Sequence, residues 1–375
     1  MVSAEEKLKK ALNSIAKYKK AYDKKHKTEL TLGLGKDLKD KGFGKITAIT
    51  TGVTAIDILL AGGMEKYAQS KERAGWTKGR FGLVEGPAGA GKTTLCYRTI
   101  AEAQKAGLIA AYVNVENSYD PQWARINGVN TDLLIGGEFD SAESGLDFII
   151  GMAKANSIDL LVYDSVVGMA SSAEYETKAG KERDLHDDSV ALIPRILSQF
   201  FRISTRAVAK SDMVVLFTNQ VRVDINAYGA PEMGPGGNAL KHHLSNRIFI
   251  RPAAKKEWPE NGVAINATVT KSNIGALVRH PMCIPFIPLE NGGTGYDNDS
   301  IIVDIAHQAG LIPFEIDQDT GEQKNNLVYT DIEGEQHRFR SINTLRLRVA
   351  EAGLIPEIKE RIFKNPEGVE LKDQS

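Results

Sequence analysis

Short apolar runs and longer amphipathic stretches alternate along most of this chain. The apolar runs have the length of β-strands and lie at 81–84, 109–115, 160–163, 213–217, 248–250 and 263–269. Near-continuous apolar strands separated by helices are typical of a parallel sheet that is covered on both faces. The pattern therefore predicts an α/β core between Ile46 and about Pro288, with a mostly parallel, twisted sheet. The polar segment 65–78 interrupts this pattern and predicts a surface loop.

The beginning of the chain follows a helical pattern instead. Apolar residues recur at spacings of three, four and seven at Leu8, Leu12, Ile15 and Tyr22, which predicts a helix over 5–25. The first 45 residues contain 13 Lys against 6 Asp and Glu, so this part of the chain is basic. Such a helix fits either a solvated surface or an arm that docks on a neighbouring subunit or on an anion.

The pattern changes again after about Gly293. A helix is expected at 300–312, a small hairpin at 326–339 and a further helix at 342–363. These elements predict a small C-terminal α+β domain. The expected organisation is an N-terminal helical oligomerisation arm with its linker at 1–45, an α/β core at 46–292 and the C-terminal domain at 293–375.

Composition narrows the class of protein. The chain has 375 residues, of which 42% are hydrophobic and 25% charged, as in ordinary globular proteins. Its net charge of −1 provides no global attraction to nucleic acid, so any such binding needs a local patch. Only Cys96 and Cys283 occur, which excludes a disulfide framework and favours a reducing compartment. With no apolar run of membrane-spanning length and no apolar signal core, we expect a cytoplasmic protein.

The most specific motif lies between a predicted strand and a predicted helix. It matches G-x-x-x-x-G-K-[ST] and reads Gly86-Pro87-Ala88-Gly89-Ala90-Gly91-Lys92-Thr93-Thr94. The glycines allow backbone N–H groups to surround an anion at the start of a helix. Lys92 supplies a positive charge for the β- and γ-phosphates, and the Thr93 hydroxyl is a ligand for Mg²⁺. The motif therefore predicts a nucleotide phosphate loop.

Two carboxylates follow apolar strands further along the chain. Asp164 comes directly after 160–163, where a carboxylate next to a phosphate loop is placed to bind Mg²⁺. Read alone, Asp164 fits a helix cap as well. Glu116 follows the run at 109–115, and the carboxyl edge of such a sheet is where ligands bind. We expect Glu116 to be the general base that activates water, with an ordinary surface carboxylate as the alternative.

Several sequence blocks, in this order, resemble the RecA-type homologous recombinases, in their bacterial form more than in the archaeal or eukaryotic form. The blocks lie at 86–95, 111–129, 161–165, 218–222 with 236–241, and 304–312. The likeness covers roughly residues 46–312. It implies that the α/β core at 46–292 is a RecA-like P-loop ATPase core that carries DNA-binding loops.

The resemblance implies roles in the nucleotide site. Lys92 and Thr93 would hold the phosphates of ATP together with Mg²⁺, and Asp164 would be the second metal residue. The whole Gly86–Thr94 loop would bind ATP, and Glu116 would be the catalytic carboxylate. The implied cofactors are therefore ATP and Mg²⁺.

Further residues of the nucleotide site are implied in the same way. Trp123 stands where the family places a tyrosine that stacks on adenine, and stacking suits either ring. Asp120 would contact the adenine, and Tyr296 belongs to the same expected nucleotide-binding set. Gln220 would sense the γ-phosphate and pass its presence to the segment that follows. Read alone, Gln220 also fits a buried amide that pairs with the backbone. Lys271 would reach across a subunit interface to the neighbouring γ-phosphate.

The resemblance also implies two DNA-binding loops. The second loop, at 221–237, is rich in glycine and proline and is followed by further polar residues; its expected DNA contacts are Arg222, Tyr228, Met233, Gly236, Gly237, Asn238 and Lys241. A flexible loop without a ligand is the alternative reading of this segment. The first loop would lie at about 174–189, with Arg195 as a phosphate contact in the helix beyond it. The expected partners are single-stranded DNA, a homologous duplex, and further copies of the chain in a helical filament.

Some positions depart from the family pattern. The 175–189 segment is acidic, and Asp224 stands where the second loop carries a basic residue, which argues for differently placed DNA contacts. Asn273 replaces the second of two lysines that reach the neighbouring nucleotide, so either slower hydrolysis or a contribution from Arg279 is expected. The tail at 367–375 lacks a strongly acidic run. These departures suggest a divergent and virus-encoded member.

The leading hypothesis is an ATP-dependent DNA recombinase that forms filaments on single-stranded DNA and catalyses homologous pairing and strand exchange. As an enzyme it would be a DNA-dependent ATPase. One alternative is a RecA-core ATPase of another class, such as a ring helicase or a recombination mediator. Another is a nucleotide-gated DNA-coating protein that barely hydrolyses ATP.

Overall fold

The computed structural model describes most of the chain, in two units that are considered separately. Described are residues 3–27, 32, 34, 37, 44–166, 168, 170–171, 192–221, 240, 242–253, 262–288, 293 and 295–364. The contacts divide the chain into units 1–46 and 47–375. The first unit contains helix α1 (Ala4–His26), which confirms the helix predicted over 5–25. Its start is fixed by a capping box, in which Ser3 and Glu6 each accept a bond from the other's backbone N–H.

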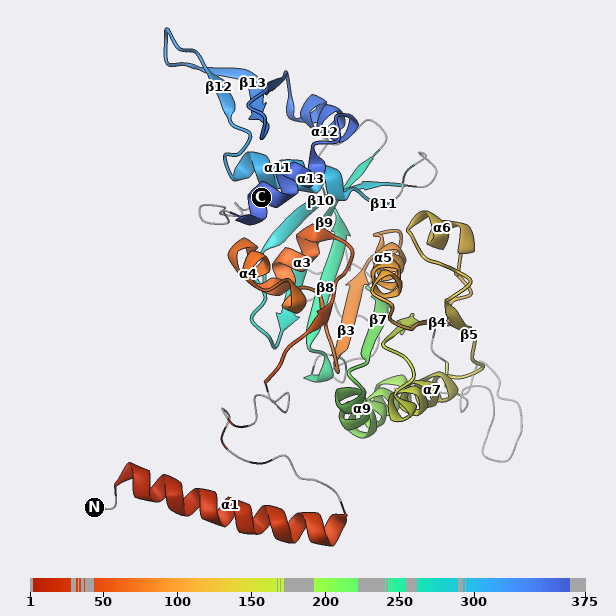
Figure 1. The fold of residues 1–375 in the computed structure, drawn as a ribbon. Helices are drawn as coiled ribbons and strands as arrows, with labels where there is room; N and C mark the ends of the chain where they lie inside the picture. Colours follow the sequence, from red (N-terminus) through yellow and green to blue (C-terminus); the bar gives the residue numbers. More distant parts are fainter. Residues whose placement is uncertain are drawn as a thin grey trace, which may run out of the picture. The chain divides into compact units, whose positions relative to one another are not determined.

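The second unit is built on a nine-stranded sheet, which confirms the predicted α/β class (Figure 1). The strand order is β11-β10-β9-β8-β3-β7-β6-β4-β5. The six parallel strands are β3 (Phe81–Gly86), β4 (Ala110–Asn114), β5 (Ile135–Gly137), β6 (Leu160–Asp164), β7 (Val214–Gln220) and β8 (Asn246–Pro252). Their carboxyl ends therefore meet at one edge of the sheet.

The remaining strands of this sheet run antiparallel. They are β9 (Val263–Ser272), β10 (Pro281–Ile287) and β11 (Gly295–Tyr296). The apolar run at 263–269 therefore belongs to an antiparallel strand rather than to the parallel part of the sheet. Ile265, Ala267 and Val269 are buried, whereas the residues between them are only half-buried, and this alternation is typical of an antiparallel strand with one covered face.

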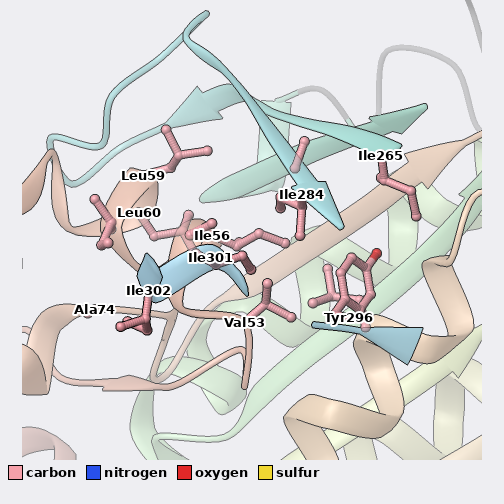
Figure 2. Close-up of a cluster of buried hydrophobic side chains, with 14 of the residues drawn as sticks. Val53, Ile56, Leu59, Leu60, Ala74, Ile265, Ile284, Tyr296, Ile301 and Ile302 are labelled. Carbon is pink, nitrogen blue, oxygen red and sulfur yellow. The ribbon is translucent and has the colours of Figure 1, made fainter. Parts of the chain in front are cut away.

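Helices cover both faces of the sheet and create two separate hydrophobic cores. One core includes residues of α3 (Thr54–Ala61), α5 (Lys92–Lys105) and α11 (Asn298–Gln308). The other lies under α7 (Ala142–Ala155) and α9 (Leu192–Ser211), which pack together (Figure 1). Alternate residues of β4 enter different cores: Tyr112 joins the first, whereas Ala111 and Val113 join the second. Figure 2 shows part of the first core, where α3, β9, β10 and α11 meet.

The segment 65–78, predicted as a surface loop, is largely structured. It contains most of α4 (Met64–Gln69), the short helix η2 (Lys71–Arg73) and β2 (Trp76–Thr77), which pairs with β1 (Ala48–Ile49). The loop prediction is wrong because the few apolar residues in this polar stretch are buried: Trp76 is 1% exposed, and the Tyr67 ring packs at 5.0 Å from that of Phe363.

The end of the chain has a small sheet and two helices, as the predicted α+β pattern requires. The strands are β12 (Phe314–Ile316), β13 (Gln323–Thr330) and β14 (Gln336–Phe339), and the hairpin predicted at 326–339 is β13–β14. The helix predicted at 342–363 is instead two helices, α12 (Ile342–Glu351) and α13 (Ile355–Lys364). They separate near Gly353, whose φ of 70° lies in the left-handed region that favours glycine. The domain boundary between 292 and 293 stays a prediction.

A short helix lies near the carboxyl edge. Helix α6 (Pro121–Ile126) begins after Asp120, which caps it, and leads into the edge strand β5. Among the described residues, no helix combines the length and the hydropathy that a membrane span requires.

Candidate functional site

The loop between β3 and α5 has the backbone of an anion-binding turn. Gly89 and Gly91 have φ angles of 71° and 90°, which favour glycine over residues with a Cβ. A Cβ on Gly86 would collide with the carbonyl oxygen of Ile250, so the loop passes close to β8 at that point. Helix α5 begins at Lys92, which places the free N–H groups of its first turn beside the loop. The local geometry of the predicted phosphate loop is therefore present.

Lys92 lies over this loop. Its Nζ donates to the carbonyl oxygens of Gly86 at 3.1 Å and Pro87 at 2.7 Å. Burial lowers the pKa of the Lys92 ammonium from its usual value, while the nearby charges of Asp164 and Glu116 act in the opposite direction. A phosphate in the loop would give this half-buried cation a stronger partner than two neutral carbonyls.

Asp164 brings the expected metal residues together. It is the last residue of β6, and its Oδ2 accepts a bond of 2.8 Å from the Thr93 hydroxyl. The same Oδ2 accepts a bond of 2.8 Å from the Tyr112 hydroxyl, and Oδ1 accepts one from the Thr218 hydroxyl. Carboxylate and hydroxyl oxygens are the kind of ligand that Mg²⁺ takes, so the donor set fits this metal.

No sequence motif predicts the hydroxyl groups of Tyr112 and Thr218 at this site. Both residues lie on strands that neighbour β6 in the sheet, namely β4 and β7. Their place beside Asp164 depends on the strand order, which no local motif encodes. The position of Thr218, two residues before Gln220 at the end of a buried strand, is the one local signal that could have suggested it.

The expected catalytic carboxylate lies at the same edge but is exposed. Glu116 follows the end of β4 by two residues, and its Oε1 accepts a bond from the Ser165 hydroxyl. Gln220, the last residue of β7, is paired with Gly86 in the sheet register. The N–H of Val221 donates to the Gly86 carbonyl oxygen at 3.2 Å. The segment that begins at Val221 is thus joined directly to the start of the phosphate loop.

A cavity of about 360 Å³ adjoins the loop on the side of α6. It is lined by residues 89–94, Asp120, Trp123, Phe286 and Pro288. The Trp123 indole Nε1 donates to the Thr94 hydroxyl at 3.0 Å, which fixes the ring against α5. Phe286 and Pro288 were not anticipated, because only the antiparallel pairing of β10 brings them here. The cavity has the aromatic and polar lining that suits a nucleobase.

Two other expected nucleotide residues have structural partners. Asp120 caps α6, its Oδ1 accepting from the N–H groups of Gln122 at 2.8 Å and Trp123 at 3.1 Å. Its side chain is exposed and borders the cavity. Tyr296 is 1% exposed and donates its hydroxyl to the Gly91 carbonyl oxygen at 3.1 Å, so it supports the loop from the core.

The remaining expected residues lie away from this cavity or outside the described residues. Lys271 is not among the residues that line the cavity; its Nζ donates to the His242 carbonyl oxygen at 3.2 Å. Arg195 is exposed near the start of α9. The expected first DNA loop at 174–189 is not described, and neither are Arg222, Tyr228, Met233, Gly236, Gly237, Asn238 and Lys241.

Comparisons with known proteins agree with this geometry. Residues 9–286 match the family model of the RecA N-terminal domain. The protein RecA of Zymomonas mobilis is 36% identical over 290 residues, which cover 73% of this chain and 75% of that protein. The protein RecA of Corynebacterium efficiens is 33% identical over 332 residues, covering 87% and 77%. The loop, the carboxylate edge and these likenesses together show that the chain belongs to the RecA family, the DNA-dependent ATPases that act as recombinases in DNA recombination and repair.

Proposed function

We propose that this chain binds ATP with Mg²⁺ at the Gly86–Thr94 loop and in that state forms a helical filament on single-stranded DNA. The filament would pair the bound strand with a homologous duplex and exchange strands. The observation that carries the proposal is the convergence of the Lys92 ammonium, the Thr93 hydroxyl and the Asp164 carboxylate beside one cavity. These groups provide a cation for phosphate and two oxygen ligands for a divalent metal.

Each residue of the proposed nucleotide site would have a separate role in ATP binding or hydrolysis. The loop N–H groups and Lys92 would hold the phosphates, and Thr93 and Asp164 would hold Mg²⁺, which when bound neutralises phosphate charge. Trp123 would stack on the adenine within the cavity. Glu116 would orient the attacking water and accept its proton. Ser165 supports that role, because its hydroxyl bond fixes the direction of the Glu116 carboxylate.

The link between nucleotide and DNA would run through Gln220. Gln220 is next to Gly86 in the sheet, and the expected DNA loop begins at Val221. A γ-phosphate that pulls the Gln220 amide toward itself would therefore act at the first residue of that loop. A two-state segment of this kind couples nucleotide binding to DNA binding without a distant relay.

One side of the proposed site is exposed, which is consistent with a neighbouring copy of the chain completing the site. Glu116 is exposed, and Lys271 lies on β9 away from the cavity of its own chain. Contacts made head to tail between identical chains produce open helical assemblies. Because Asn273 stands where the family carries a second lysine, we expect the neighbouring copy to contribute one cation from this pair and hydrolysis to be slow.

Electron microscopy with single-stranded DNA and a non-hydrolysable ATP analogue tests the proposal most directly. Helical filaments that need both DNA and analogue are expected, together with stimulation of ATP hydrolysis by single-stranded DNA. Closed rings would favour a RecA-core ATPase of another class. Nucleotide-dependent coating with negligible hydrolysis even on DNA would favour a DNA-coating protein. DNA binding that is equal with and without nucleotide would contradict the proposal.

A further inference from the structure

The carboxylate of Asp164 is held by an unusual number of hydroxyl groups. It is 3% exposed, and it accepts bonds from Thr93, Tyr112 and Thr218. Thr93 comes from the first turn of α5, beside the loop, and Thr218 comes from β7, which neighbours β3 in the sheet. Tyr112 comes from the middle of β4 and reaches Asp164 from the interior of the first core.

Tyr112 is rigidly placed for this contact. Its side chain is 2% exposed, and its ring packs 5.6 Å from the ring of Tyr97 and 5.5 Å from that of Tyr119. The rings of Tyr97 and Tyr119 lie 6.1 Å apart, so the three tyrosines form one cluster. A ring enclosed in this way has little rotamer freedom, and its hydroxyl therefore stays at 2.8 Å from Asp164 Oδ2.

The bond from Tyr112 restricts how Asp164 can turn. Without Tyr112, the Thr93 hydroxyl would be the donor that limits rotation of the carboxylate at Oδ2. Thr93 itself belongs to the expected metal site. Tyr112 is a fixed donor outside that site, and Thr218 holds the other oxygen. Removal of a group that holds a metal ligand in place commonly weakens metal binding by about 10–100-fold.

We propose that Tyr112 is a positioning residue for the divalent cation, which it serves by fixing the Asp164 carboxylate beside the Thr93 hydroxyl. This inference rests on the proposed function, because it concerns the cation that accompanies the nucleotide. It differs from a packing role in a testable way. Phenylalanine supplies the same ring to the tyrosine cluster and lacks only the hydroxyl that reaches Asp164.

Tyr112→Phe and Tyr163→Phe form a matched pair for the test. Tyr163 is 1% exposed and directly precedes Asp164 in β6, but its side chain lies in the second core on the opposite face of the sheet. Each variant thus loses one buried phenolic hydroxyl. The Tyr112 hydroxyl contacts Asp164, whereas Tyr163 neighbours Asp164 in sequence but points to the other core. Thermal unfolding of both full-length variants checks that they fold.

The measurement is the dissociation constant of Mn²⁺, followed by electron paramagnetic resonance with a non-hydrolysable ATP analogue present. Tyr112→Phe is expected to weaken Mn²⁺ binding about tenfold, and Tyr163→Phe to leave it unchanged. Affinity for the analogue in EDTA should be the same for both variants and the wild type. Equal Mn²⁺ binding by Tyr112→Phe and wild type, or equal weakening in both variants, would overturn the inference. Wild-type protein that binds neither analogue nor Mn²⁺ would instead refute the proposed function on which it rests.

Discussion

The loop after β3 has half-buried functional groups, whereas the segment after β4 has exposed carboxylates, although both sets of groups make hydrogen bonds. Lys92 and Thr93 are half-buried and bonded to Pro87 and Asp164 respectively. Glu116 and Asp120 are exposed. The two segments reach the same edge of one sheet, so the contrast separates the half-buried side of the proposed nucleotide site from its exposed side.

Strand order accounts for this difference. β3 lies between β8 and β7 near the middle of the sheet, whereas β4 is separated from the edge only by the three-residue strand β5. A loop that follows a central strand is surrounded by neighbouring strand ends, which supply partners such as Gln220. A segment that follows a strand near the edge has fewer such neighbours. It is therefore the side on which, under the proposed function, we expect a second protein chain to complete the site.

The largest effect on binding is expected from Lys92→Ala on the half-buried side. Loss of the charged partner of a phosphate costs about 2–5 kcal/mol, so ATP affinity should fall by about 30-fold or more. Nucleotide-dependent DNA binding should disappear with it, which fluorescence anisotropy of a labelled oligonucleotide with and without ATP analogue would measure. Unchanged nucleotide-dependent binding would show that the loop does not anchor the phosphates and would contradict the assignment of this side to phosphate binding.

A more selective effect, on hydrolysis alone, is expected from Glu116→Gln on the exposed side. Removal of a general base lowers hydrolysis by about 10²–10⁴-fold, while the phosphate loop stays intact. Steady-state ATP hydrolysis on single-stranded DNA should therefore fall, and the affinity for a non-hydrolysable analogue should stay close to that of the wild type. If both quantities fall together, Glu116 contributes to binding, and the division between the two sides is less sharp than the structure indicates.

The smallest effect is expected at Trp123, which joins the two sides through its bond to Thr94. Loss of one aromatic platform under a base costs about 1–3 kcal/mol, so Trp123→Ala should weaken ATP binding by about tenfold. Trp123→Tyr keeps a stacking ring and should bind ATP nearly as well as the wild type. Titration of both variants with a fluorescent ATP analogue measures the difference, and equal affinities in the two variants would exclude stacking at this position.

Local patterns were sufficient for much of the site. The run from Gly86 to Thr94 encodes its own turn, because glycine conformations and the start of a helix are decided by neighbouring residues. Asp164 and Glu116 were placed correctly at the carboxyl edge, since parallel strands end on the same side. The basic helix at the start of the chain was likewise visible from its spacing alone.

The pairing of distant segments was decided only in the tertiary structure. Strand order brings Tyr112 and Thr218 to Asp164 and places Phe286 beside the phosphate loop, although these residues are far apart in sequence. Burial of Trp76 likewise depends on a pairing between β1 and β2 that the polar segment around it conceals. Sequence by itself thus determined most of the helices and strands and the turn at Gly86–Thr94, because those depend on neighbouring residues. The tertiary structure decided which side chains hold the Asp164 carboxylate and line the cavity, because strand register depends on contacts between remote parts of the chain.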